Sequence, residues 1–177
     1  MSAPTTDFSR LFKVKALPGQ PIVLEASAGE RAALSDRFGL PGVDSLRAVI
    51  ELEQRGASIR ARGTLEAAIR QTCATSGEDF PAQISEEVDL RFVERSAPEP
   101  HADGDIEIEL DAADCDEFEY YGDTFDLGEA IAQTLGLAID PYAEGPEADG
   151  ARQRAGITAD GQQDGPLAAA LLALKRG

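Results

Sequence analysis

The sequence predicts one α+β domain, with an antiparallel sheet that is either open or barrel-like and two helices, followed by a flexible linker and a C-terminal helix. Three observations predict it: long stretches of alternating apolar and polar residues, two stretches with helix start signals, and a late Gly-rich stretch without periodicity. At 177 residues the chain has the length of about one domain. We expect a disordered N-terminus over 1–9, the domain over 10–142, the linker over 143–164 and a docking helix over 165–177.

The N-terminal part of the domain is expected to form a strand and then a helix. The stretch QPIVLEA reads as a strand, and Ser27 follows it directly. Ser27 stands three residues before Glu30, which is the spacing of a capping box at a helix start. Gly39 is expected to end this helix, because glycine readily takes the left-handed backbone conformation found there.

A hairpin is predicted after Ser45, where the hydrophobic period changes to two. The stretch SLRAVIELEQ and the stretch SIRARGTLEAAIRQ each place apolar residues at every second position. Gly56 lies between them and can supply the positive φ of a tight turn. One face of this hairpin should therefore pack in a core while the other meets water.

The remaining elements follow the same reasoning. AQISEEVDLRFV continues the alternation, interrupted on its apolar face by Glu86, and IEIELD over residues 106–111 resumes it. Asp126 precedes Glu129 by three residues and can cap a helix over LGEAIAQTLGLAI. We therefore expect further strands and a second helix.

The net charge of −17 lies in one part of the chain. Between Ser96 and Ala151 there are 17 acidic residues and no Lys or Arg, and the other residues carry 16 charges of each sign. Two interpretations stay open: a solubilising stretch, or a surface that attracts a basic protein partner. The candidate contacts for such a partner are Asp111, Asp114, Asp116, Glu117 and Glu119.

Four arginines share the polar face of the predicted hairpin, and they also allow two interpretations. Their guanidinium groups can hold the phosphates of RNA. Alternatively they form cross-strand ion pairs with Glu51, Glu53 and Glu66 on a solvated face. The candidate RNA contacts are Arg47, Arg60, Arg62 and Arg70.

No catalytic or metal-binding motif stands out in the sequence. The chain has no Gly-rich phosphate loop, and its single histidine, His101, lies in a Pro-rich loop. Four sulfur or nitrogen ligands are usual for a structural zinc, and only Cys73, Cys115 and His101 are available. We therefore expect no enzyme, cofactor, metal or small-molecule substrate, although a thiol-dependent enzyme using Cys73 remains a rival interpretation.

The sequence also bears on location. It contains no run of about 18 apolar residues, and the stretch MSAPTTDFSR lacks the basic and then apolar layout of a signal peptide. Two cysteines are too few for a disulfide scaffold. We expect a cytoplasmic protein without membrane contact.

Three stretches resemble the YceD family of bacteria, described as the large ribosomal RNA subunit accumulation protein. CATSGEDF is similar to the family's Cys-x-x-Cys-x-x-x-Phe, and YGDTFDLGEAIAQTLGLAIDP to its acidic approach to a helix that ends near Leu-Ala-Leu-Pro. The C-terminal GPLAAALLALKRG resembles the family's closing Asn-Pro-Phe-Ala-Val-Leu-Ala-x-Leu-Lys. The three occur in the family's order over about 105 residues.

One of these stretches departs from the family pattern. Many family members complete Cys-x-x-Cys with His and Cys after the helix, which suggests a zinc site. Here Ser76 replaces the second cysteine, and YAEGPEADG after the helix contains neither His nor Cys. The resemblance therefore implies that Cys73 is a degenerate single ligand position, with packing in place of a metal.

The resemblance implies a non-enzymatic factor in ribosome biogenesis that supports large-subunit (23S) rRNA. Its expected partners are the large-subunit precursor or that rRNA, contacted directly or indirectly, and a basic large-subunit ribosomal protein. The alternative is a generic acidic adaptor or chaperone without a ribosomal role. A C-terminal helix of about twelve residues needs a docking surface to be stable. Its candidate docking residues are Pro166, Leu167, Leu171, Leu174 and Lys175.

Overall fold

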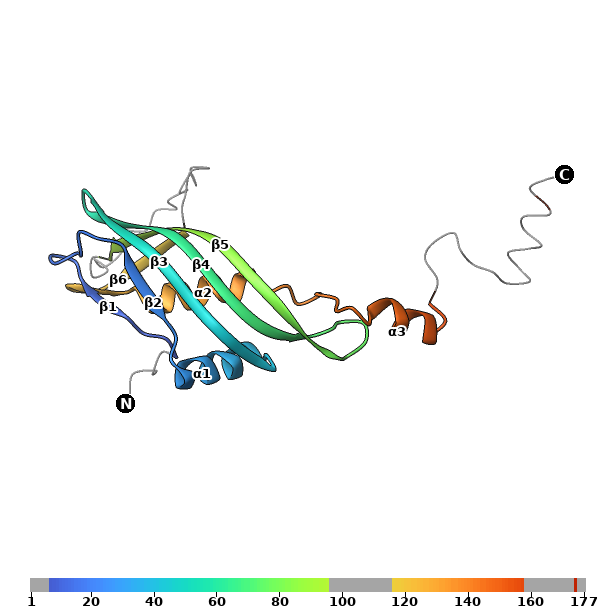
Figure 1. The fold of residues 1–177 in the computed structure, drawn as a ribbon. Coiled ribbons are helices and arrows are strands. Elements are labelled where there is room, and N and C mark those ends of the chain that lie inside the picture. Colours follow the sequence, from blue (N-terminus) through green and yellow to red (C-terminus); the bar gives the residue numbers. More distant parts are fainter. Residues whose placement is uncertain (1–6, 96–115, 158–173, 175–177) are drawn as a thin grey trace, which may run out of the picture. The chain divides into compact units, whose positions relative to one another are not determined.

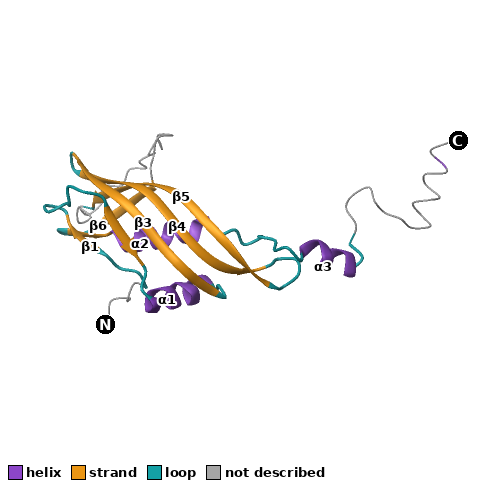
Figure 2. Ribbon diagram, in the orientation of Figure 1, coloured by secondary structure: helices purple, strands orange, loops and turns teal. Residues whose placement is uncertain are grey.

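The computed structural model describes residues 7–95, 116–157 and Leu174 (Figure 1). Along these residues two strands are followed by a helix, five strands and two helices, and Figure 2 shows the strands in orange and the helices in purple. The strands are β1 (Leu11–Lys13), β2 (Ile22–Glu25), β3 (Gly42–Arg55), β4 (Ser58–Thr72), β5 (Asp79–Glu94), β6 (Asp116–Tyr120) and β7 (Thr124–Asp126). The helices are α1 (Ala28–Phe38), α2 (Leu127–Ala138) and α3 (Ala148–Arg154).

The main sheet has the strand order β2-β3-β4-β5-β6, and β1 pairs with β7 in a separate two-stranded sheet. This confirms the predicted α+β class, with an open sheet rather than a closed barrel in the described part. The β2–β3, β3–β4 and β1–β7 pairs are antiparallel. One expectation was wrong: β6 pairs with β5 in parallel. A parallel neighbour needs a connection of about a dozen residues or more, and the chain between β5 and β6 is long enough.

The predicted hairpin is confirmed as β3 and β4, the long neighbouring strands in Figure 1. Arg55 pairs with Ser58 at its tip, and Gly56 there has a φ of 60°. Further along, Gly63 lies opposite Ile50, and a Cβ atom at Gly63 would come within 1.8 Å of the carbonyl oxygen of Val49. Only glycine fits that position.

Both predicted helix starts are confirmed. Ser27 and Glu30 form the reciprocal bonds of a capping box at α1, which ends at Gly39 with a φ of 64°. At α2 the side chain of Asp126 accepts the N–H of Glu129 at 3.0 Å. The apolar side of α2 is fully buried, and burying one such Leu or Ile side chain contributes about 1.5–3 kcal/mol.

The N-terminal residues correct the expected disorder over 1–9, because residues 7–9 are part of the fold. Phe8 is completely buried, and the Ser9 hydroxyl donates to the carboxylate of Asp126 at 2.5 Å. The backbone N–H of Arg10 donates to the same carboxylate at 2.8 Å. The sequence could not predict this order, because Phe8 is a single apolar residue and its neighbours follow no hydrophobic period.

Aromatic rings gather at one end of the sheet, although the chain contains few of them. The ring centroid of Phe125 lies 4.5 Å from that of Phe92, 6.0 Å from that of Phe12 and 6.2 Å from that of Tyr120. Phe118 of β6 lies 5.6 Å from Phe92. This cluster attaches the small β1–β7 sheet and β6 to the core, at about 0.5–1.5 kcal/mol per ring pair beyond burial.

The chain divides into two compact units, one of residues 1–71 with 81–140 and one of residues 72–80 with 141–177. The first carries the sheet, α1 and α2. Within the second, α3 corrects part of the expected linker over 143–164. Alanine and arginine favour helix, and Arg152 pairs with Asp149 one turn away at 2.9 Å, so a short helix forms without an apolar period.

Candidate functional site

The Cys73 loop, residues 73–80, begins after β4 and is closed by its own backbone. The N–H of Cys73 donates to the carbonyl of Glu78, and the N–H of Gly77 donates to the carbonyl of Cys73, both at 2.9 Å. Gly77 has a φ of 74°, which a residue with a side chain adopts at a cost. Two backbone hydrogen bonds and the left-handed conformation of Gly77 therefore close the turn.

The sulfur of Cys73 lies inside this turn. Cys73 is 3% exposed, and the N–H of Ser76 donates to its Sγ at 3.3 Å. Hydrogen bonds from the Ser76 side chain, and then from the Ser76 backbone, lower the pKa of the Cys73 thiol to about 7. Backbone N–H groups of Gly145 and Thr75 act in the same direction. Ser76 thus supplies donors to the sulfur at the position where the family pattern has a second cysteine.

The segment after α2 lies against this loop within the second unit. The N–H of Ala74 donates to the carbonyl of Ala143 at 3.0 Å, and the hydroxyl of Thr75 donates to the carboxylate of Glu144 at 2.6 Å. The ring of Phe80 occupies the space beside Gly145, where a Cβ atom would lie 2.8 Å from it. Two hydrogen bonds and the packing of Phe80 thus join the two stretches.

Glu144 links this contact to α3. Its carboxylate also accepts a hydrogen bond from Arg152, which pairs with Asp149 as well. The Arg152 guanidinium, followed by the Thr75 hydroxyl, lowers the pKa of the Glu144 carboxyl. Glu144 had no distinguishing signal in the sequence, because its partners come from 69 residues earlier and eight residues later.

The four candidate arginines of the hairpin face solvent together, but each forms an ion pair. Arg60 and Arg62 approach the same carboxylate of Asp89 on β5, at 2.6 and 3.5 Å. Arg47 pairs with Glu25 of β2 at 3.3 Å, and Arg70 pairs with Asp44 at 3.0 Å. These contacts give the ion-paired interpretation of this face direct geometric support.

The strand register explains part of this pattern. Arg62, Arg60 and Arg47 lie opposite three glutamates of the hairpin, as expected for cross-strand pairs. The ion pairs above, however, recruit carboxylates from strands β2 and β5 and from the start of β3. Asp89 was missed in the sequence, although it alternates with Leu90 and so had to face the same side as the arginines.

Aromatic side chains of the main sheet do not share the arginine face. Phe92 and Tyr120 are buried, and Phe118 is half-buried on the same side as they are. RNA-binding sheets stack bases on exposed aromatic rings. Across strands β2 to β6 as described, the arginine face offers charge but no ring for stacking.

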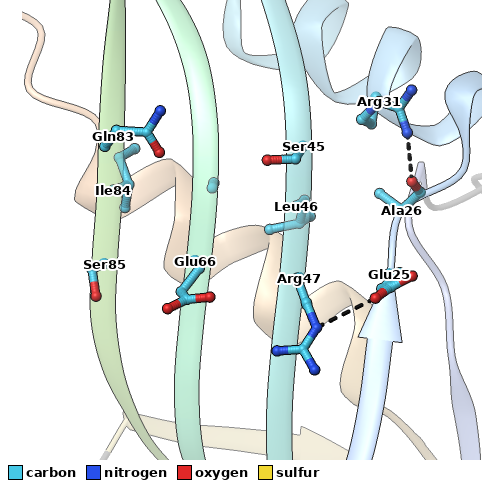
Figure 3. A pocket seen from close by; sticks show the side chains of 11 residues that line it. Glu25, Ala26, Arg31, Ser45, Leu46, Arg47, Glu66, Gln83, Ile84 and Ser85 are labelled. Carbon is cyan, nitrogen blue, oxygen red and sulfur yellow. Dashed lines mark hydrogen bonds and ion pairs between the residues drawn. The ribbon is translucent and has the colours of Figure 1, made fainter.

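A hollow of about 610 Å³ lies over β2 to β5 beside α1. Figure 3 shows Glu25 paired with Arg47, Glu66 on the neighbouring strand, and Arg31 of α1 donating to the carbonyl of Ala26. Positive and negative side chains alternate around it, with Ser85 at its far side. It is a mixed polar surface without a dominant charge.

Of the five acidic candidates, three lie in the described part of the chain. Asp116, Glu117 and Glu119 are exposed on β6, the last strand of the main sheet. Glu117 pairs with Arg91 at 2.9 Å, and Glu119 pairs with Arg95. Arg91 of β5 and Arg95 directly after it were not expected as partners, because the parallel pairing of β6 decides their proximity.

Several expected residues lie outside the described part of the chain, namely Asp111, Asp114, His101, Cys115 and the strand over 106–111, together with Pro166, Leu167, Leu171 and Lys175. Leu174 is helical and 83% exposed. Over residues 7–95 and 116–157, no three His, Cys, Asp or Glu side chains come together as a metal site. None of the described helices is long and apolar enough to cross a membrane.

These features define an α+β protein with a cysteine loop that is joined to the segment following its second helix. A family model described as "Large ribosomal RNA subunit accumulation protein YceD" matches residues 61–175, or 115 of the 177 residues. The chain belongs to the YceD family. The match begins within β4 and includes the Cys73 loop, α2 and most of the C-terminal stretch, whereas α1 and β3 precede it. No curated protein and no solved structure matched the chain.

Proposed function

We propose that this protein supports the accumulation of large-subunit (23S) rRNA by binding to ribosome precursors or their proteins in the cytoplasm, without catalysing a reaction. Family membership over residues 61–175 is the observation that carries the proposal. The family is described by rRNA accumulation and not by a reaction.

The surface charges favour a protein partner over naked RNA. Each candidate RNA contact is already ion-paired with a neighbouring carboxylate; these contacts are Arg47, Arg60, Arg62 and Arg70. The phosphates of RNA would have to displace these carboxylates from the arginines before binding could release the RNA counterions into solution. A basic large-subunit ribosomal protein suits the acidic candidates Asp111, Asp114, Asp116, Glu117 and Glu119. Glu117 and Glu119 are themselves paired with Arg91 and Arg95, but a carboxylate keeps acceptor positions for a further basic group.

The Cys73 loop is proposed to be structural. A thiol with a pKa of about 7 is partly ionised at neutral pH, which a nucleophile requires. The sulfur is nevertheless buried, and its described surroundings supply hydrogen bonds from Ser76 but no histidine. We interpret Cys73 as a single remaining ligand position whose loop is closed by hydrogen bonds and by Glu144.

The test is the ratio of large- to small-subunit rRNA in cells that lack the gene. We expect a selective fall in the large-subunit species, restored by the wild-type gene and by Cys73→Ser. A gene carrying Asn or Gln at the five acidic positions should not restore it. An unchanged ratio in the deletion strain would contradict the proposal.

A generic acidic adaptor remains the competing function, and the acidic stretch favours it as much as the ribosomal one. Sedimentation of the tagged protein through a sucrose gradient separates the two. A ribosomal factor should travel with large-subunit precursors and leave them at high salt, where surface electrostatics are screened. An adaptor should stay at the top of the gradient at every salt concentration.

A further inference from the structure

The outer edge of β6 is the feature that carries a further inference. β6 ends the main sheet, and no other described strand pairs with its outer side. The edge of a sheet presents a row of N–H and C=O groups that an added strand can satisfy. Recognition by strand addition uses these groups for affinity and the alternating side chains for specificity.

The outward backbone groups of β6 can be assigned. The carbonyl of Tyr120 accepts the N–H of Arg95 at 3.0 Å, so the backbone of Tyr120 is directed toward β5. The N–H and C=O of one residue point to the same side of a strand, and successive residues alternate. Glu117 and Glu119 therefore direct their backbone groups away from β5, and Phe118 directs its groups toward β5.

The side chains at this edge define what a bound strand must carry. Glu117 and Glu119 are exposed on the arginine face. Among the described side chains, Glu117 pairs with Arg91 and Glu119 pairs with Arg95. A carboxylate has about four acceptor positions, so each can accept a further basic side chain. On the opposite face Phe118 is half-buried, so it leaves apolar surface beside the edge for an aliphatic side chain.

We propose that the outer edge of β6 binds an extended protein segment in which Lys or Arg alternates with aliphatic residues. The segment adds a strand through the backbone of Glu117 and Glu119, places its basic side chains against their carboxylates, and packs its aliphatic side chains on Phe118. Charge complementarity selects the occupant, since no Lys or Arg occurs between Ser96 and Ala151. This deepens the proposed function and rests on it, because it specifies how the acidic residues would hold a basic protein.

The test uses the full-length protein and two capped hexapeptides: one alternating Lys with Val (the valine peptide), and one with the same side chains but every backbone amide N-methylated. The two carry the same charge, but the N-methylated peptide has no backbone N–H to donate to the edge. Amide exchange followed by NMR should show rapid exchange at Glu117 and Glu119 in the free protein. The valine peptide should slow both at least tenfold, whereas the N-methylated peptide should slow neither.

A variant pair isolates the backbone contribution. Glu117→Pro removes an outward N–H, which an edge strand tolerates, and Glu117→Gln removes the charge alone. Affinity for the valine peptide should fall at least tenfold in Glu117→Pro and by a smaller factor in Glu117→Gln. If Glu117→Pro does not fold, the comparison of the two peptides by amide exchange of the wild-type protein still tests the strand pairing.

Two results would overturn the inference. Slow exchange at both glutamates in the free protein would mean that the edge is already covered, by this chain or by a second copy. Equal binding of both peptides would mean that charge alone is recognised. Neither result depends on the rRNA ratio in the deletion strain, so this inference can fail while the proposed function stands.

Discussion

The guanidinium of Arg10 donates to both carboxylate oxygens of Glu30, with Nη1 to Oε1 at 2.6 Å and Nη2 to Oε2 at 3.1 Å. The same carboxylate accepts the backbone N–H of Ser27 at 2.8 Å and so completes the cap of α1. Arg10 also lies over the ring of Phe8, 4.6 Å from its centroid. One carboxylate thereby joins the N-terminal residues to the first helix of the sheet unit.

Glu30→Gln should lower the free energy of unfolding by about 1–2 kcal/mol at pH 7, since it weakens a charge-assisted pair and a cap. The Arg10 guanidinium lowers the pKa of Glu30 to about 2. Because the pKa of Glu30 is lower in the folded protein, its ionised carboxylate stabilises the fold fully above about pH 4.5. This stabilisation is lost as the pH falls toward 2. Urea unfolding from pH 7 to pH 2 measures the difference.

Glu53→Gln is the matched control for this variant. Glu53 pairs with Arg55 at 2.9 Å on the exposed hairpin end, and such pairs contribute less than about 0.5–1 kcal/mol. It should leave the free energy of unfolding nearly unchanged at every pH. If both variants behave alike, the Arg10–Glu30 pair does not stabilise the fold.

Gly63→Ala should destabilise the protein by about 3 kcal/mol or more, because its Cβ would meet the backbone oxygen of Val49 at 1.8 Å. The oxygen belongs to the paired strand, so relief requires a shift of the hairpin. Gly19→Ala is the control, since nothing lies within 4 Å of its added Cβ. Thermal unfolding compares the two, and equal midpoints would refute the close approach.

The Cys73 thiol should titrate near pH 7 in a Cys115→Ser background, as measured by thiolate absorbance. Ser76→Ala should raise this pKa, because the Ser76 side chain is the main cause of its depression. The folded protein should gain stability as the pH rises from 7 toward the pKa of the unfolded thiol, and Cys73→Ser should abolish that gain. Ser45→Ala, in the other unit, should leave the titration in place; an equal shift would exclude a specific effect of Ser76.

Removal of metal should leave the protein unchanged. Its sequence offers only Cys73, Cys115 and His101 as sulfur or nitrogen ligands, and the Cys73 loop is closed by hydrogen bonds. We expect the same melting temperature with and without EDTA, and much less than one zinc per chain by atomic emission. A melting temperature that falls with EDTA and returns with zinc would show that a metal site persists.

Asp89→Asn should raise affinity for an RNA homopolymer several-fold at low salt, because Asp89 is paired with both Arg60 and Arg62. The gain should vanish in high salt, where the Debye length falls to about 3 Å. Glu87→Gln changes the net charge equally on the same strand, outside these ion pairs. Equal gains in both variants would mean that net charge alone is responsible.

Local sequence patterns predicted the elements whose signals are local. The period of two placed the hairpin, and the spacing of Ser27 from Glu30 and of Asp126 from Glu129 placed both helix starts. These predictions succeeded because alternation and capping depend on neighbours two to four residues away. The motif around Cys73 also led to the family that the comparison confirms.

Long-range contacts lay beyond such patterns. The parallel pairing of β6 gives Glu117 and Glu119 their arginine partners, and strand order brings Asp89 to two arginines. The contact of Glu144 with Thr75 likewise joins residues 69 positions apart. No period in the sequence encodes which strand becomes a neighbour.

The sequence by itself determined the α+β class, the helix caps, the turn at Gly56 and the location of the negative charge. Tertiary structure decided which charges neutralise one another, how Phe8 is buried, and that β6 forms the last described strand of the sheet. The division has a physical reason. Helix caps and hydrophobic periods depend on residues that are close in the sequence. Pairing between distant segments depends instead on how these segments pack around a shared core.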